Sequence, residues 1–451
     1  MNDLTQGSVR GHILRFSAFI AMSTVFQTLY FIADLYFVGR LGKEAIAGVA
    51  LAGNLTMVVL ALTQSLGVGA TSLIAQAIGR REKEHAEVAF NQSLVLSTLV
   101  GVAFGVVAFA LRGAYCRSLA ADGETAAKGI EYLNWFIPAL CLQFPLVAMG
   151  SALRGLGDLK IPTAISVVTV MLNIALAPLL MFGLVTGHPL GVAGAALASF
   201  LAIAFGLVAF ILYFRRTTSP LDFRVKDWRP QPRLWWRMLG VGLPAGGEFA
   251  LISVYITLVY AIIKPFGVAA QAGFGIGGRV MQSLFLPAVA IAFAASPVAG
   301  QNYGARLGSR VRETFTSAAV MTAIVMLIIT ALCHIAPDSI VRFFNADPAV
   351  VAFGAEYLRI ISWNFLATGV VFVSSSIFQG MGNTLPPLAS SSMRIILFAI
   401  PAYALSRQPG FEMRHVWYLS VGSVFVQLGV NLWLLHREFD RKLAFEPVAA
   451  D

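Results

Sequence analysis

Twelve long apolar runs constrain this chain more than any other feature of its sequence. Each has about 20 residues or more, the length that an α-helix needs to cross a hydrocarbon layer of roughly 30 Å. Backbone polar groups find no water inside lipid, so such runs fold there as helices. The sequence therefore predicts an all-α membrane protein with twelve transmembrane helices. The runs lie near residues 13–38, 46–74, 88–111, 129–152, 160–183, 190–214, 237–263, 268–300, 314–336, 352–378, 385–405 and 414–436.

The composition agrees with a membrane protein and excludes several classes of enzyme. Apolar residues make up 58% of the 451 positions and charged residues 12%, with a mean hydropathy of +0.77. No phosphate-binding GxxxxGK[ST], zinc-binding HExxH or GxSxG motif occurs. Cys116, Cys141 and Cys333 are odd in number and far apart, which favours neither a disulfide framework nor a metal site. We expect no cofactor, so any pumping draws on an ion gradient.

The net charge of +10 is explained by membrane topology. If the amino terminus is cytoplasmic, 20 of the 32 lysines and arginines fall in cytoplasmic segments. Positive charge concentrates on that side of multi-pass membrane proteins. We therefore expect a multi-pass protein of the cell membrane with both termini in the cytoplasm, a partner in the lipid bilayer and none in nucleic acid.

The chain carries a faint internal repeat at an offset of 225 residues. Four short segments of the first half match segments of the second half on this one offset without gaps, among them GIEYL (129–133) on GAEYL (354–358) and RGLGDLKIP (154–162) on QGMGNTLPP (379–387). Each half then holds six helices, and because six is even, both halves enter the membrane in the same direction. The sequence predicts two six-helix lobes related by a pseudo-twofold axis along the membrane normal.

The longest polar stretch of the chain separates the two halves. It contains three prolines, seven basic residues and three tryptophans in RRTTSPLDFRVKDWRPQPRLWWR (215–237). Basic side chains at anionic headgroups and tryptophans at the interface account for this composition. We predict an N-lobe at 1–214, a cytoplasmic linker at 215–236 and a C-lobe at 237–451.

Asp34 is the clearest ionisable residue inside an apolar run. A charge at the centre of a membrane helix costs about 2.5–3.5 kcal/mol, so such residues usually have a function. Asp34 shares a helical face with Gln27 and Tyr30. Loss of water disfavours the ionised form, which would let this carboxylate exchange protons near neutral pH. The alternative is an acid tied to neighbouring hydroxyl or amide groups for packing alone.

Polar residues in other runs are candidate partners of this acid. Asn173 and Ser199 lie near small residues in the fifth and sixth runs, although both types also serve simply to join helices. Glu248 follows GLPAGG in the seventh run and is a candidate for a substrate cavity or for a hydrated site at the cytoplasmic mouth. Arg279 and Arg394 could pair with acids, although we interpret them as side chains that extend to the interface.

Several motifs give the chain a resemblance to the multidrug and toxic compound extrusion (MATE) family. They are the D-x-x-F-V-G-R-L-G pattern of residues 34–42, the Gln-x-x-Gly-Arg pattern of residues 76–80 and the duplicated connection at 154–162 and 379–387. The chain looks more similar to the DinF-like branch than to the NorM branch, because its tenth run has no acid beyond Glu356 at the outer edge. The resemblance implies a secondary transporter, not an enzyme, that moves small organic compounds, and we expect a monomer.

The resemblance also implies roles for individual residues. Asp34 would be the ion-coupling carboxylate, with Asn173 and Ser199 at polar positions of the same site, and Gln27, Tyr30 and Glu248 as candidates for the substrate cavity. Ala177 stands where the DinF-like branch often has an aspartate, which favours protons over a sodium site with two carboxylates.

We therefore expect a proton-coupled antiporter that exports amphipathic, often cationic, compounds by alternating access, with sodium as the alternative ion. A lipid-linked oligosaccharide flippase of the same superfamily, or a membrane receptor or scaffold that transports nothing, are the alternative functions.

Overall fold

The chain folds as a bundle of long α-helices, as the sequence predicts. The computed structural model describes residues 3–120, 122–184, 187–216, 221–344 and 347–445. These residues form fourteen α-helices and two short 3-10 helices, and none of them forms a strand. Eleven helices are long and apolar enough to cross a membrane, and one bent pair of helices passes the same test together. Counting that pair as one span gives twelve, and the predicted all-α membrane fold is confirmed.

The bent pair lies where the sequence predicts the tenth span, at residues 352–378. Its helices, α11 (Pro348–Ile361) and α12 (Asn364–Gly380), meet at an angle of 54°. At the break, Thr330 donates a hydrogen bond of 2.9 Å to the backbone carbonyl of Ser362. A side chain from a neighbouring helix thus satisfies a carbonyl group at the bend, as lipid surroundings require. The sequence predicts a continuous span here because the usual markers of a kink, Pro and Gly, are absent near the break.

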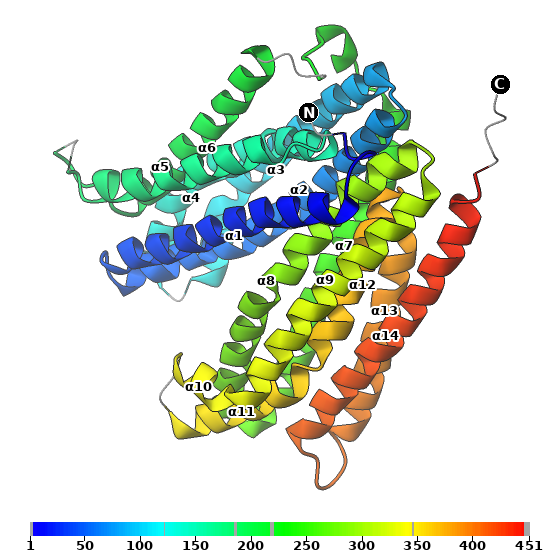
Figure 1. The fold of residues 1–451 in the computed structure, drawn as a ribbon. Coiled ribbons are helices and arrows are strands. Elements are labelled where there is room, and N and C mark those ends of the chain that lie inside the picture. The colour runs from blue at the N-terminus through cyan, green and yellow to red at the C-terminus, as the bar shows by residue number, and fades with distance from the viewer. Residues whose placement is uncertain (1–2, 121, 185–186, 217–220, 345–346, 446–451) are drawn as a thin grey trace, which may run out of the picture. The chain divides into compact units, whose positions relative to one another are not determined.

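One compact unit comprises residues 19–243 of the described chain. In this unit α4 contacts α2, α3 and α6 (Figure 1). Its core contains the buried α4 residues Tyr132, Leu133, Phe136, Leu140 and Phe144. The helices of this half are α1 (Val9–Gly39), α2 (Lys43–Gly79), α3 (Lys83–Leu119), α4 (Gly123–Gly155), α5 (Lys160–Met181) and α6 (Gly191–Arg216).

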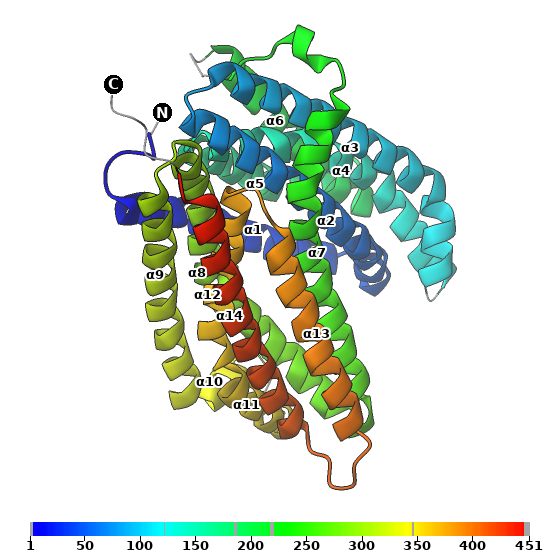
Figure 2. The same ribbon diagram turned by 90° about the vertical axis from the view of Figure 1, so that its right-hand side faces the viewer.

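The other compact unit comprises residues 3–18 and the described residues from Pro244 onward. Here α12 contacts α8, α9 and α14 (Figure 2). The buried Trp417 stacks on Phe274, with ring centroids 5.8 Å apart, and meets Tyr357 edge to face at 4.8 Å. The helices of this half, besides α11 and α12, are α7 (Pro232–Ile263), α8 (Val268–Gly304), α9 (Gly308–Ile335), α10 (Pro337–Arg342), α13 (Leu385–Leu405) and α14 (Met413–Lys442).

The backbone confirms the internal repeat. Helices α2 and α8 both have 37 residues, and their first and last residues lie 225 positions apart. Left-handed backbone conformations recur on the same offset, at Gly42 and Gly267, Arg81 and Arg306, and Gly157 and Gly382. Glycine adopts this conformation without steric cost, which explains two of the three pairs. The duplication is therefore conserved at turns, where the backbone is most restricted.

The boundaries of the compact units differ from the predicted lobes at two equivalent places. Residues 3–18 belong with the second half, and residues 237–243 belong with the first. The changes of unit, after residue 18 in α1 and after residue 243 in α7, lie 225 positions apart. Hence α1 and α7 each contribute to both units. We call residues 3–18 and 228–243 the lead-in segments.

The described part of the linker is bound to α3, whereas the sequence predicts contact with lipid headgroups. Asn91 donates to the carbonyl of Asp222 (2.9 Å) and accepts from the indole N–H of Trp228 (2.9 Å). Gln92 accepts from the indole N–H of Trp235 (2.8 Å). The indole groups of these two tryptophans are therefore satisfied by protein, while the side chain of Trp236 is 72% exposed.

Candidate functional site

Asp34 lies in the last third of α1 with its side chain half-buried. Its carboxylate makes neither a hydrogen bond nor an ion pair with any residue that the structure describes. The hydroxyl groups of Tyr30 and Tyr132 lie within electrostatic range of it. A carboxylate in such a setting can change its protonation without first breaking an ion pair.

Three polar residues form a cluster beside this acid. The hydroxyl groups of Tyr30 and Ser199 lie 3.2 Å apart, and the amide of Asn173 donates to Ser199 at 3.0 Å. The cluster joins α1, α5 and α6, and the side chains of Asn173 and Ser199 are only 5% and 3% exposed. The hydrogen bonds of the Asn173 amide nitrogen and the Ser199 hydroxyl help to offset the cost of burying them. The structure thus brings Asn173 and Ser199 together with Tyr30, and their role in ion coupling stays a prediction.

The cluster offers few of the ligands that a metal cation prefers. Ala177, one turn after Asn173 on α5, is buried and contributes no oxygen from its side chain. No group of three or more His, Cys, Asp or Glu side chains suited to a metal occurs in the part of the chain that the structure describes. The residues of the cluster, Tyr30, Asn173 and Ser199, are all neutral.

Gln27 and Glu248 make no hydrogen bond with the described residues of this cluster. Gln27 is exposed on α1 and has no partner among the described residues. Glu248 belongs to the other compact unit, near the middle of α7. Its Oε1 atom accepts hydrogen bonds from Ser375 (3.1 Å) and Ser391 (3.2 Å). The role of Glu248, in a substrate cavity or at a hydrated site at the cytoplasmic mouth, stays a prediction.

The second unit contains a similar cluster that the sequence analysis missed. The hydroxyl groups of Tyr255 and Ser420 lie 2.9 Å apart, and the amide of Asn364 donates to Ser420 at 3.3 Å. The repeat offers one signal for it, because Tyr255 lies 225 residues after Tyr30. The guanidinium carbon of Arg394 lies 5.1 Å from the centre of the Tyr255 ring, so this arginine does not extend to the interface as predicted.

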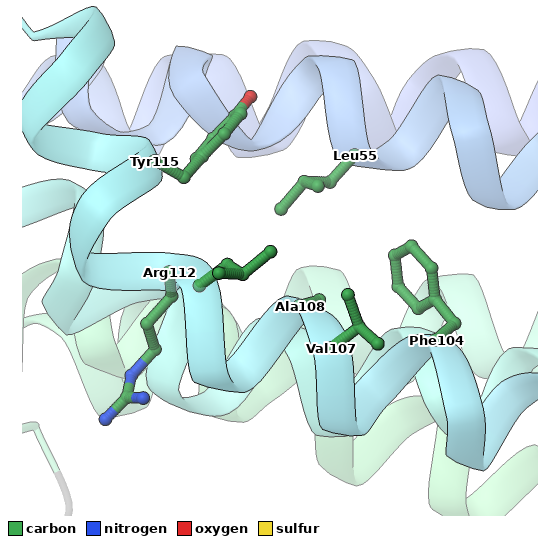
Figure 3. A pocket seen from close by; sticks show the side chains of 7 residues that line it. Leu55, Phe104, Val107, Ala108, Arg112 and Tyr115 are labelled. Atoms are coloured by element: carbon green, nitrogen blue, oxygen red, sulfur yellow. The ribbon is translucent and has the colours of Figure 1, made fainter.

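Two pockets in the described part of the chain are lined by none of the predicted site residues. One has a volume of about 160 Å³ and lies between Leu55 of α2 and the apolar face of α3 around Phe104 and Val107 (Figure 3). Another, of about 330 Å³, is lined by His334, Trp363 and Tyr418 among others. The two polar clusters described above lie between packed helices and do not line either pocket.

A family model described as MatE matches the chain twice, at residues 20–179 and 244–404. The two matches begin 224 residues apart and end 225 apart, in agreement with the offset of the repeat. Together they cover well over half of the chain.

Individual relatives and solved structures agree over most of the chain. It is 25% identical to the "Probable multidrug resistance protein YoeA" of Bacillus subtilis over 88% of this chain and 87% of the relative. It is 23% identical to the "FAD transporter" of Shewanella oneidensis over 83% of each. A structure of a multidrug resistance MATE family transporter in its outward-facing conformation superposes with a TM-score of 0.89, with 26% identity and 98% of both chains covered. The chain belongs to the MATE family of membrane transporters.

Proposed function

We propose that this protein is a proton-coupled antiporter that exports amphipathic organic compounds, cationic ones among them. The observation that carries the proposal is the half-buried Asp34, which has no hydrogen-bond or ion-pair partner among the described residues. An ionised acid without a partner in a membrane span destabilises the protein, so such residues usually have a function. Its place beside the neutral Tyr30, Asn173 and Ser199 cluster supports the coupling role.

Protons are favoured over sodium by the chemistry of the neighbouring groups. Sodium, as a hard cation, requires several oxygen ligands, as hard cations in proteins generally do. The hydroxyl of Ser199 already takes part in hydrogen bonds with Asn173, Tyr30 and the carbonyl of Ala195, and the side chain of Ala177 supplies no oxygen. A proton needs only the carboxylate. This argument supports coupling through Asp34 alone.

The substrate range follows from the relatives. Several carry multidrug resistance or multidrug export in their names, and one is named as an FAD transporter. We propose that this protein exports several compounds from the cytoplasm as a monomer in the cell membrane, with both of its termini in the cytoplasm. The placement of 20 of 32 basic residues in the segments between spans on that side supports the orientation.

Coupling would work through the charge of Asp34. The ionised form would favour the state that accepts substrate from the cytoplasm. Protonation from outside would neutralise the site, favour release of substrate outward, and be reversed when the proton leaves on the inner side. A ligand shifts such an equilibrium only by its difference in affinity for the two states, so the bound proton must stabilise one state more than the other.

The test uses the full-length protein in proteoliposomes, with proton and sodium gradients imposed separately and ethidium as the cationic probe. We expect uphill movement of ethidium on the proton gradient, and its loss in Asp34→Asn, which keeps the shape but cannot ionise. Asp440→Asn is the matched control, since Asp440 is an exposed carboxylate near the end of α14. Wild-type rates in Asp34→Asn would overturn the coupling role, and movement driven by sodium alone would overturn the choice of ion.

A further inference from the structure

Arg394 is a cation in the middle of a membrane-spanning helix. It is the tenth of the 21 residues of α13, about 14 Å along the axis from the first residue and about 16 Å from the last. Its guanidinium group lies over the ring of Tyr255, a residue of α7. The side chain is therefore directed toward a neighbouring helix instead of along its own helix to the interface.

This guanidinium has no counterion within the described residues. Its Nε atom is buried and has no hydrogen-bond partner there, and none of the ion pairs in the described ranges includes Arg394. Its aromatic contact is with Tyr255, whose ring centre lies 5.1 Å from the guanidinium carbon. A neutral ring attracts a cation, but this attraction is far weaker than an ion pair.

Glu248, an acid inside a membrane span of the same unit, has hydrogen-bond partners other than Arg394. Glu248, seven residues before Tyr255 on α7, accepts hydrogen bonds from Ser375 and Ser391. Ser391 lies three residues before Arg394 on α13 and also accepts from Gln427 of α14 at 3.0 Å. The hydroxyl of Tyr255 is engaged with Ser420 at 2.9 Å. Glu248, Ser391 and Tyr255 therefore have hydrogen-bond partners among the described residues, whereas the Nε atom of Arg394 has none.

A partly buried charge with no partner destabilises a protein unless something compensates it. Guanidinium presents five N–H donors in a planar fork that fits the two oxygens of a carboxylate or phosphate. Stacking on Tyr255 uses the face of the group and leaves the donors on its edge free for such a ligand. We propose that Arg394, supported by Tyr255, binds an anionic group, a carboxylate or a phosphate, of the exported compound.

The proposal rests on the proposed export function and narrows its substrate class. Compounds with an acidic group, including zwitterions, would be bound in the second unit through this group. The coupling acid Asp34 belongs to the other compact unit, so binding of the anion and proton coupling can be disrupted separately.

The test measures binding to the purified full-length protein in detergent, where no gradient is needed. The anionic probes are carboxyfluorescein and flavin mononucleotide, the cationic probe is ethidium, and fluorescence polarisation is the readout. In Arg394→Met we expect about tenfold weaker binding of both anionic probes and unchanged binding of ethidium. Arg394→Lys, which keeps the charge but not the fork, should give an intermediate loss. Arg407→Met is the matched control, because Arg407 also lies over a tyrosine ring, that of Tyr403, but on an exposed segment.

Each outcome decides the proposal. Equal loss of all three probes in Arg394→Met, or no binding of either anionic probe by the wild type, would overturn it. Displacement of both anionic probes by phosphatidylglycerol, bound more tightly at Arg394, would identify a lipid phosphate site and overturn the assignment to substrate. Asp34→Asn should keep anionic binding while losing proton-driven export, so failure of the coupling role and failure of the anion site give different results.

Discussion

The two halves of this protein share a backbone and differ in charge. In each half a tyrosine hydroxyl meets a serine hydroxyl that also accepts from an asparagine amide. The tyrosines, Tyr30 and Tyr255, lie on the repeat offset of 225. Next to the cluster, the first half has the acid Asp34 and the second has the base Arg394. The duplicated scaffold thus carries a neutral hydrogen-bonded cluster twice, with an acid on the same helix as the tyrosine in one copy and an arginine over the tyrosine ring in the other.

The lead-in segments show a second difference on the same scaffold. Residues 228–243 approach α2 so closely that backbone meets backbone, whereas residues 3–18 are held mainly by side chains. In the second case Leu4 donates to Gln301 (3.2 Å) and accepts from Asn302 (3.1 Å). Equivalent segments are therefore fixed by steric fit in one half and by polar side chains in the other. This difference predicts which substitutions each half tolerates.

The largest effect is expected where backbones touch. A Cβ atom on Gly242 would collide with the backbone carbonyl of Ser65, while a Cβ atom on Gly240 would meet open space. Gly242→Ala should therefore destabilise the protein by about 3 kcal/mol. Gly240 lies two residues earlier, on another face of the same helix. Gly240→Ala should be neutral or slightly stabilising, since Ala has a higher helix propensity than Gly. Melting in detergent measures both. Equal melting temperatures for the two variants would contradict a close crossing of α2 and α7.

The next effects on stability are expected from the buried asparagines that bind the linker and the amino-terminal segment. The loss of stability should be larger for the linker. Asn91 is fully buried and bonds Asp222, Arg224 and Trp228, so Asn91→Ala should cost about 3 kcal/mol. Asn302→Ala should cost about 1–2 kcal/mol, because Arg310 also bonds the carbonyls of Leu4 and Gly7 directly.

Proteolysis of the native protein separates these anchors from general stability. Asn91→Ala should expose residues 222–231 to cleavage, and Asn302→Ala should expose the first residues of the chain. The exposed Asn134 supplies the control, as its partner Arg112 lies at the surface. If both anchor variants are cleaved at the same sites as Asn134→Ala, the lead-in segments are held by other contacts.

Much of the architecture was readable in the sequence because it depends on patterns that extend over many residues. Apolar runs predicted the spans, and turn residues such as Gly42 and Gly157 recur on the offset because their left-handed conformation restricts substitution. The break at Ser362 was not predicted, since it depends on Thr330 of another helix. Attachment of the linker through Asn91 and Gln92 was also missed, because amide side chains do not reveal their partners.

The polar clusters were predicted in part for a related reason. Asp34 is conspicuous in an apolar run, and a resemblance to a known family pointed to Asn173 and Ser199. The second cluster was not predicted because its serine and asparagine do not lie at the positions that the repeat offset gives. The offset positions of Asn173 and Ser199 are Phe398 and Val424, both buried and apolar. Ser420 lies one turn before the offset position on the same helix, α14, and Asn364 belongs to α12, whereas Asn173 belongs to α5. The tyrosine, serine and asparagine thus meet in both halves, although only the tyrosines lie on the repeat offset.

The smallest effect on stability, and the sharpest comparison, comes from the two serines. Ser199→Ala and Ser420→Ala each remove one hydroxyl that joins a tyrosine to an asparagine, at a cost of about 1–2 kcal/mol in both halves. Their functional effects should differ. In Ser199→Ala, the freed hydroxyl of Tyr30 can donate to the carboxylate of Asp34, and donors stabilise the ionised form. Protonation of Asp34 then requires more acid, so the pH of half-maximal proton-driven export in proteoliposomes should fall.

Ser420→Ala has no acid beside its tyrosine and should leave that pH unchanged while lowering the melting temperature similarly. Similar shifts of the pH profile in both variants would mean that stability, and not the neighbourhood of Asp34, sets the profile. No shift in either would mean that Tyr30 does not reach the acid. A shift confined to Ser199→Ala would separate the hydrogen-bonded cluster that both halves share from the proposed proton site at Asp34.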